Sequence, residues 1–122
     1  MVAIDAIARD FTAMLRAGRF TAAGDAYWAE AVTSVEPADL ANGTPASISG
    51  IAAARAKAEA RFGEHAIVEL GIDGPFVTGN QFALFLDMLI ADPAGGVAQP
   101  FTEIAVFTVR NGRIVEERFF YD

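Results

Sequence analysis

The last stretch of the chain, VFTVRNGRIVEERFFYD (Val106 to Asp122), determines the fold. β-Branched and aromatic residues flank Asn111-Gly112 on both sides, and this dipeptide is a strong short-range signal for a two-residue hairpin turn. In such a hairpin Arg110 pairs with Arg113, and further cross-strand partners have residue numbers with a constant sum. The stretch therefore predicts two antiparallel strands in a defined register.

This register assigns the residues of the two strands to two faces of the sheet. One face is mainly apolar with a single carboxylate, and we expect it to be covered by the helices: Ile104, Val106, Thr108, Val115, Glu117, Phe119 and Tyr121. The other face is charged but has two phenylalanines, which suits a dimer interface: Glu103, Ala105, Phe107, Glu116, Arg118 and Phe120. A one-residue bulge would instead turn Glu117 to solvent and bring Glu116 inward.

Period-two patterning extends back to about residue 66, with turns expected at the GP, GN, DPAGG and NG pairs or clusters. The half of the chain before it predicts three helices. The first ends at Gly18, the second spans residues 19–28, and the third spans residues 50–63 with Ser49 as a cap. Helices followed by antiparallel strands predict an α+β domain in which the helices cover one face of the sheet.

The composition indicates one domain, residues 1–122, with more apolar residues than a small core easily hides. Of the 122 residues 53% are hydrophobic, and the mean hydropathy is +0.33. An apolar cavity or a partner surface is therefore expected. The formal charge of −7 disfavours nucleic-acid binding.

Several other classes of site and location are disfavoured by single features. There is no cysteine, and the lone His65 stands in no ligand pattern, so neither a metal nor another cofactor is expected. The longest apolar run is interrupted by Asp87 and is too short to span a membrane. The N-terminus does not resemble a signal peptide, so a soluble, cytoplasmic protein is expected.

The first candidate for chemistry is Glu36, in the stretch VTSVEP (Val32 to Pro37). A carboxylate in an apolar pocket resists ionisation and becomes a better base. At the end of a strand it could equally be a solvated residue that caps the following loop. That loop, residues 38–49, is rich in proline, glycine, asparagine and serine, and the sequence leaves open whether it closes as a lid.

Four stretches together resemble the nuclear transport factor 2-like superfamily, and within it the SnoaL-like proteins and the ketosteroid isomerases. They are AMLRAGRF (13–20), YWAEAVTSVEP (27–37), SGIAAARA (49–56) and the C-terminal stretch quoted above. The resemblance covers essentially the whole chain. It implies a cone-shaped curved antiparallel sheet wrapped around three helices, a pocket inside the cone, and a homodimer formed through the outer sheet face.

The resemblance also implies site residues. In the isomerases the general base is a carboxylate at the end of the first strand just before a proline, which is the position of Glu36. Phe11 stands where that family has a hydrogen-bonding tyrosine, and Ile104 stands where it has a protonated acid, so two oxyanion donors are missing. Independently of the resemblance, the hairpin register places Glu117 on the covered face, and Asp87 interrupts an otherwise apolar strand, so Glu117 or Asp87 would assist Glu36. The expected pocket residues are Phe11, Met14, Phe20, Tyr27, Trp28, Phe62, His65, Ile104, Phe119 and Tyr121.

Two functions follow from this pattern. The first is cofactor-independent acid/base catalysis of the isomerase, cyclase or dehydratase type on a small apolar carbonyl-containing molecule. The second is a module that binds a small molecule, or dimerises, without chemistry. Loss of both oxyanion donors favours the second, whereas the position of Glu36 favours the first.

Overall fold

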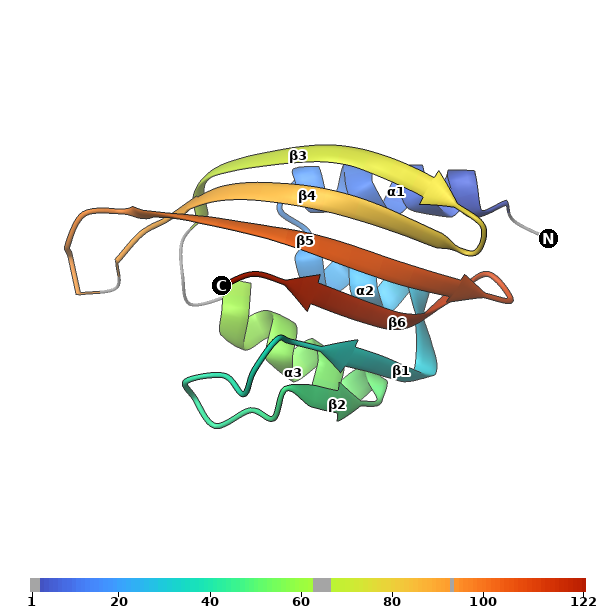
Figure 1. Ribbon diagram of the computed structural model, residues 1–122, viewed down its shortest axis with the longest axis horizontal. Coiled ribbons are helices and arrows are strands. Elements are labelled where there is room, and N and C mark those ends of the chain that lie inside the picture. The colour runs from blue at the N-terminus through green and yellow to red at the C-terminus, as the bar shows by residue number, and fades with distance from the viewer. Residues whose placement is uncertain (1–2, 63–66, 93) are drawn as a thin grey trace.

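The computed structural model describes residues 3–62, 67–92 and 94–122. Its helices are α1 (Ile4–Arg16), α2 (Phe20–Tyr27) and α3 (Ile51–Phe62). Its strands are β1 (Trp28–Val35), β2 (Ser47–Ser49), β3 (Ile67–Thr78), β4 (Gln81–Ile90), β5 (Gln99–Arg110) and β6 (Arg113–Phe120). The strands form one open, curved sheet in the order β2-β1-β6-β5-β4-β3 (Figure 1).

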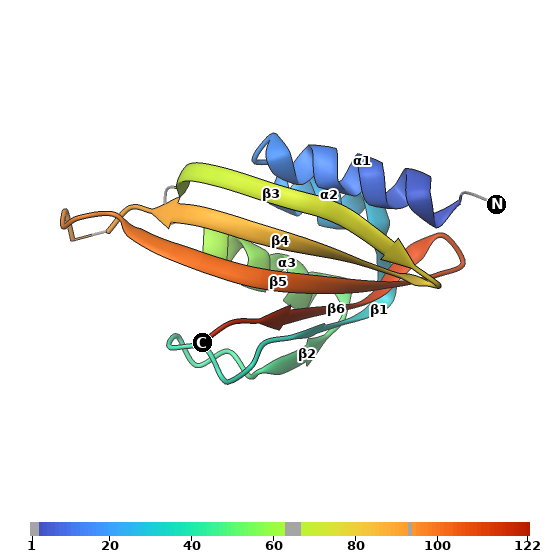
Figure 2. The same cartoon turned by 45° about the horizontal axis from the view of Figure 1, so that its top comes forward.

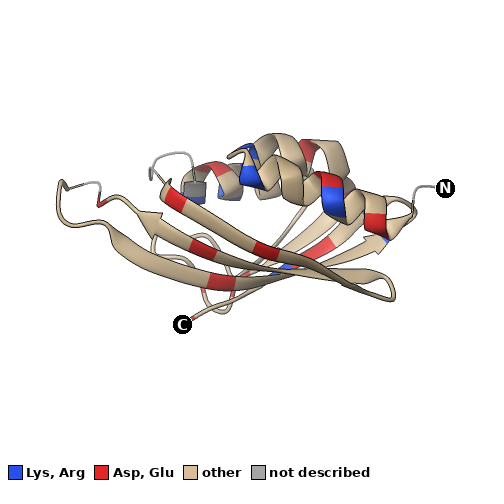
Figure 3. Cartoon of the chain, turned by 90° about the horizontal axis from the view of Figure 1, so that it is seen from above, with Lys and Arg blue, Asp and Glu red and all other residues tan. Residues whose placement is uncertain are grey.

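The three helices lie on one face of this sheet (Figures 2 and 3), so the predicted cone-shaped α+β fold is confirmed. The sheet is mixed and not wholly antiparallel, because β1 runs parallel to its neighbour β6. Helix α1 buries Ile7, Phe11 and Leu15, which recur at four-residue steps. The chain leaves this helix through Gly18, whose φ of 77° is in the left-handed region that favours glycine.

The C-terminal hairpin has the predicted turn but not the predicted register. Asn111 and Gly112 have φ of 53° and 76°, and Arg110 pairs with Arg113. One step further the register shifts, because Val109 lies opposite Ile114 while Thr108 lies opposite Glu116. The extra residue of this β-bulge is Val115.

The bulge exchanges the two faces of β5, and on β6 it brings Ile114 inside in place of Val115 while leaving Glu117 and Phe119 as predicted. Glu117 and Phe119 are buried in the interior, as expected. On β5, however, the buried residues are Glu103, Ala105 and Phe107, whereas Ile104 is 47% exposed. The predicted inner face was therefore wrong for β5, and an acid faces inward where an isoleucine was expected.

A second bulge keeps β3 continuous where a turn was expected. The sequence pair Gly74-Pro75 predicted a break between two strands, but the register with β4 only shifts between Asp73 and Phe76. The Arg16 Nη2 atom at the end of α1 donates to the carbonyl oxygens of Ile72 (3.0 Å) and Gly74 (3.1 Å). The end of α1 is thereby attached to the bulged part of the sheet.

Aromatic side chains fill the space between the helices and the sheet. The rings of Phe11 and Phe107 lie 4.9 Å apart edge to face, and those of Phe82 and Phe107 stack at 4.8 Å. Trp28 packs directly on α2, since a Cβ atom added to Gly24 would lie 2.3 Å from the indole ring. Glycine at this position lets the indole reach the interior, where it contacts the candidate site.

Candidate functional site

Charged side chains gather inside the apolar cone. Glu36, Lys57, Glu103 and Glu117 are each at most 6% exposed. The carboxylates come from the end of β1 and from β5 and β6, and the lysine comes from α3. Figure 3 shows both basic and acidic residues on the helices and mostly acidic ones on the visible strands. Burying charges is costly unless they are paired, so the partners of each determine what the cluster can do.

Both oxygens of Glu36 are engaged. Lys57 Nζ lies 2.9 Å from Oε2, and the Tyr121 hydroxyl donates to Oε1 at 2.7 Å. Arg61 Nη1 lies 3.5 Å from the same Oε1. Glu36 is therefore not the solvated cap of a loop, because it is a buried, charge-paired carboxylate. Its role as a general base stays a prediction, and its contacts suit a group that positions Lys57 and Arg61.

Tyr121 is a hydrogen-bond donor in this network. Burial and the hydrogen bond to Glu36 raise the pKa of the Tyr121 phenol well above its ordinary value. The hydroxyl therefore keeps its proton at neutral pH. Its ring also packs edge to face on Phe101, at 5.1 Å between centroids.

Glu103 has one engaged oxygen and one free oxygen. Its Oε2 accepts from Arg61 Nη2 at 2.6 Å, whereas its buried Oε1 has no hydrogen-bond partner among the described residues. Burial raises the pKa of the Glu103 carboxyl, against the lowering effect of Arg61. Glu103 thus supplies an inward-facing acid on the penultimate strand, where the sequence predicted Ile104. The bulge at Val115 hid it.

Glu117 is held from two sides. Trp28 Nε1 donates to Oε1 at 2.8 Å, and Ser34 Oγ donates to Oε2 at 2.6 Å. Burial raises the pKa of the Glu117 carboxyl, while the hydrogen bonds from Ser34 and Trp28 lower it. Glu117 is therefore fixed in orientation and has a greater affinity for a proton than an exposed glutamate.

Glu103 and Glu117 both line a small cavity inside the cone. Its volume is about 40 Å³. That is room for only a few water-sized groups of roughly 10 to 15 Å³ each. Four of the predicted pocket residues, Phe11, Phe20, Trp28 and Phe119, lie on its wall, together with Leu15, Ala58, Leu86 and Phe107. The arrangement is an apolar chamber with two carboxyl groups.

A profile of the SnoaL-like domain matches residues 2–121, which is nearly the whole chain. The chain belongs to the SnoaL-like family. A protein from Mesorhizobium loti, provisionally named a SnoaL-like polyketide cyclase, is 33% identical to it, with 98% of this chain and 100% of that chain covered and a TM-score of 0.88.

Two further structures share the fold at lower identity. One, provisionally named a SnoaL-like polyketide cyclase from Jannaschia sp., is 16% identical, with 93% of this chain and 83% of that chain covered and a TM-score of 0.73. The other, an NTF2-like protein of unknown function from Burkholderia pseudomallei, is 18% identical, with 93% and 86% covered and a TM-score of 0.72. No curated protein matches the SnoaL-like chain.

The structure does not bring every predicted site residue of this SnoaL-like domain to the cavity. Asp87 and Ile104 are exposed on the outer face of the sheet, so neither their predicted catalytic role nor their predicted pocket role fits their position. Met14 is half-buried against the core, and the Tyr27 hydroxyl donates to Asp10 near the surface. The Phe62 side chain and His65 lie outside the described residues.

Tyr121 lies at a second hollow, at the mouth of the SnoaL-like cone. This hollow has a volume of about 300 Å³ and is lined by Leu40, Ala41, Asn42, Ala60, Arg61, Ile90, Phe101 and Tyr121. Part of the predicted loop therefore contributes to its wall.

Within residues 3–62, 67–92 and 94–122, no three acidic or histidine side chains are grouped as metal ligands, and no helix is long and apolar enough to cross a membrane.

The buried acids of the SnoaL-like domain make its stability depend on pH. An acid whose folded-state pKa is raised above its ordinary value of 4.5 stabilises the fold fully only below that value. The contribution is lost as the pH rises through the folded-state pKa, and each pH unit between the two pKa values corresponds to about 1.4 kcal/mol. We therefore expect Glu117→Gln, which keeps the shape, to gain stability relative to wild type as the pH is raised from 5 to 8.

Urea unfolding at several pH values measures this difference. Glu116→Gln, one residue away on the same strand and only half-buried, is the control and should run parallel to wild type. A Glu117→Gln curve that also runs parallel to wild type would contradict the raised pKa.

Proposed function

We propose that this SnoaL-like protein binds a small, mainly apolar, carbonyl-containing molecule in the inner cavity and moves a proton on it without a cofactor. Glu103 is the proton-transfer group. The observation that carries the proposal is the buried Glu103 Oε1, which has no hydrogen-bond partner among the described residues, on a residue that lines an apolar cavity. Buried polar atoms are usually paired, and the exceptions need an explanation such as a ligand or a catalytic role.

The surroundings of Glu103 suit proton abstraction next to a carbonyl group. Its ionised form, desolvated in the cavity, is a stronger base than an exposed carboxylate. Oε1 receives the proton from the α-carbon, while Arg61 on Oε2 fixes the orientation of the group. The electron pair moves to the carbonyl oxygen, and return of a proton to the α-carbon completes the exchange. Where a carbon–carbon double bond is conjugated with the enolate, return of the proton to the γ-carbon shifts that double bond and completes an isomerisation.

Glu117 is the second acid of the proposed site. Besides burial, the negative charges of Glu36 and Glu117 contribute to raising the pKa of Glu103. A pair that holds one proton offers one base and one donor. In its neutral form Glu117 donates a hydrogen bond to the enolate oxygen, which replaces the oxyanion donors that the sequence lacks at Phe11 and Ile104.

A module that binds without chemistry is the second candidate. The small volume of the inner cavity favours it, since four phenylalanine rings stand on the wall of a chamber of about 40 Å³. In that case Glu103 and Glu117 would only orient a ligand. The two functions differ in whether a bound carbonyl compound loses α-protons.

Deuterium exchange separates the two functions without a known substrate. The protein is incubated in D₂O with a panel of uncharged ketones, such as cyclohexanone and acetophenone, and loss of the α-proton signals is followed by NMR. We expect exchange of at least one ketone to exceed that with the heat-unfolded protein. Saturable binding without exchange would support the binding module, and neither binding nor exchange would contradict both.

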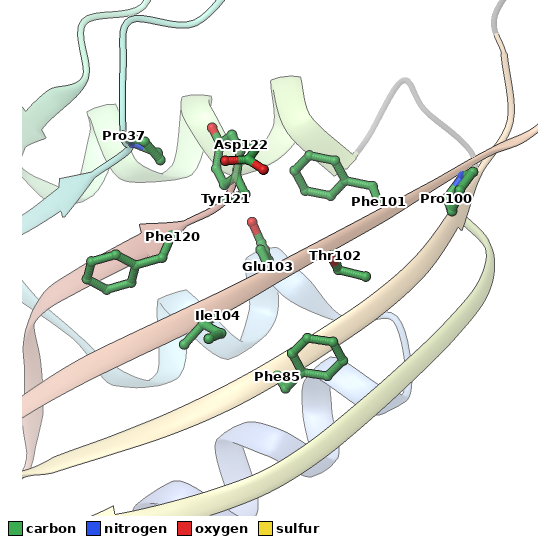
Figure 4. Close-up of a pocket in the computed structure, with 10 residues that line it drawn as sticks. All are labelled: Pro37, Phe85, Pro100, Phe101, Thr102, Glu103, Ile104, Phe120, Tyr121 and Asp122. Atoms are coloured by element: carbon green, nitrogen blue, oxygen red, sulfur yellow. The ribbon is translucent and has the colours of Figure 1, made fainter.

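We also propose that the protein is a homodimer joined through the outer sheet face. Phe85, Ile104 and Phe120 are 37%, 47% and 49% exposed and form one row across three strands, because Ile104 pairs with both of the others. Figure 4 shows the three side chains on adjacent strands beside an outer hollow of about 610 Å³. An apolar row of this kind is typical of a partner surface.

Ile104→Glu should convert the dimer to a monomer, because it places a charge at the centre of the row. Size-exclusion chromatography with light scattering at micromolar concentration measures the mass. Val97→Glu, at an 80% exposed apolar position outside the row, is the matched control and should stay dimeric. A wild-type protein that runs as a monomer would refute the proposed interface.

A further inference from the structure

The inner cavity shares a wall with a hollow on the helical side of the molecule. This hollow has a volume of about 280 Å³ and is lined by Gly18, Arg19, Phe20, Thr21, Ala22, Ala58 and Glu59. Phe20 and Ala58 also line the inner cavity. Among the described residues, the two spaces therefore share one half-buried aromatic ring from α2 and one methyl group from α3.

The other sides of the cavity are closed by stronger contacts. Toward the mouth of the cone, Arg61 holds Glu103 at 2.6 Å and Tyr121 holds Glu36 at 2.7 Å. Opening this side would separate buried charged groups, which is strongly unfavourable. Glu103 also borders the hollow on the outer face, but its side chain has no exposed surface.

The wall at Phe20 is formed by an apolar ring and not by a buried ion pair. Phe20 is the first residue of the short helix α2, and it follows Gly18, which has a φ of 77°. With the ring moved aside, the cavity and the helix-side hollow become one space. Their combined volume reaches the lower end of the range for small-molecule sites, roughly 300 Å³.

We propose that ligands enter the inner cavity from the helical side, between Phe20 and Ala58, and that the Phe20 ring sets the width of the molecule that passes. This deepens the proposed function and rests on the inner cavity being the ligand site. In this account the inner cavity is small because the Phe20 ring separates it from the hollow on the helical side.

Fluorescence quenching tests this route directly. Trp28 is the single tryptophan of the chain, is 4% exposed and lines the inner cavity. Acrylamide is small and uncharged, carries a carbonyl group, and quenches the indole only on contact. Ala58→Leu should lower the quenching constant of the otherwise wild-type protein, because it narrows the passage. Phe20→Ala should raise the constant several-fold, and adding Ala58→Leu to it should return the constant toward wild type.

Each of the two variants has a control in which the same substitution is made at a residue that lines the mouth hollow or the outer hollow. Ala60→Leu adds the same side chain to α3 two residues along, at the mouth hollow. Phe101→Ala removes the same ring from a residue that borders both the mouth hollow and the outer hollow. Both controls should leave the constant unchanged, and an unshifted Trp28 emission maximum verifies that each variant is folded. Ala60→Leu lowering the constant while Ala58→Leu leaves it unchanged would overturn the proposal.

The test is independent of turnover, since quenching requires no reaction. Glu103→Gln should quench like wild type even if it abolishes deuterium exchange. If the Phe20 and Ala58 variants change the quenching constant but the protein exchanges no α-protons, the entry route is supported and the catalytic proposal is wrong. If the protein exchanges α-protons but only the Ala60 and Phe101 variants change the quenching constant, the catalytic proposal is supported and the entry route is wrong.

Discussion

Replacing Lys57 by Met will destabilise the protein by about 3 kcal/mol, because the Glu36 carboxylate stays buried without its ammonium partner. The side chains of Lys57 and Glu36 are 2% and 0% exposed, so water cannot replace the lost contact. Tyr121 and Arg61 still face Glu36 Oε1, which keeps the loss at the lower end for a broken buried pair. Urea unfolding at pH 7 measures the change.

Arg55 provides the matched control on the same helix. It lies two residues before Lys57 and contacts Asp25 at 2.6 Å, but the two side chains are 48% and 40% exposed. Exposed ion pairs contribute little, so Arg55→Met should cost much less stability than Lys57→Met. Adding Glu36→Gln to Lys57→Met should restore part of the lost stability. Equal losses for Lys57→Met and Arg55→Met would show that burial of the Glu36 pair is not what stabilises this end of the cone.

Glu103→Gln will lower α-proton exchange by about 10²- to 10⁴-fold, the usual contribution of a positioned acid or base. Glutamine keeps an oxygen that accepts from Arg61, so the hydrogen bond at 2.6 Å has a substitute. The glutamine amide cannot take up a proton as the carboxylate does, so the reaction is lost while the fold remains. Exchange rates measured by NMR in D₂O, with unfolding curves for both proteins, test this.

Two further acids sharpen the comparison. Glu116→Gln, on the outer side of β6 with its carboxylate near Arg118, should exchange like wild type. Glu36→Gln should reduce exchange less than Glu103→Gln if Glu36 only positions Arg61. Full activity of Glu103→Gln together with loss of activity in Glu36→Gln would instead favour Glu36 as the base, as its place before Pro37 predicted.

The helices, the hairpin turn and the interior position of Glu117 could be predicted because each depends on local signals. The spacing of apolar residues predicted α1, and the pair Asn111-Gly112 predicted the hairpin turn. The bulge at Val115 could not be predicted, because the sequence pattern of a strand does not distinguish a valine that pairs with the neighbouring strand from one that is the unpaired residue of a bulge. That single residue reversed β5 and concealed Glu103.

The cations of the site were missed for a different reason. Lys57 and Arg61 stand in an alanine-rich helix, where such residues are usually solvated. Their spacing by four places them on one face, one turn apart and beside Ala54 and Ala58, which was a weak signal that this face turns inward. Their partners Glu36 and Glu103 are 21 and 42 residues distant, and only the tertiary fold brings them together.

The role of Glu103 can be tested at the carboxyl group itself, by an NMR titration of its carboxyl carbon in ¹³C-labelled protein, assigned with Glu103→Gln. We predict that its pKa lies above the ordinary value of 4.5 and that a bound ketone shifts this signal more than that of Glu36. A Glu103 carboxyl that titrates at or below 4.5, and does not respond to any ketone that binds, would contradict the assignment of Glu103 as the proton-transfer group.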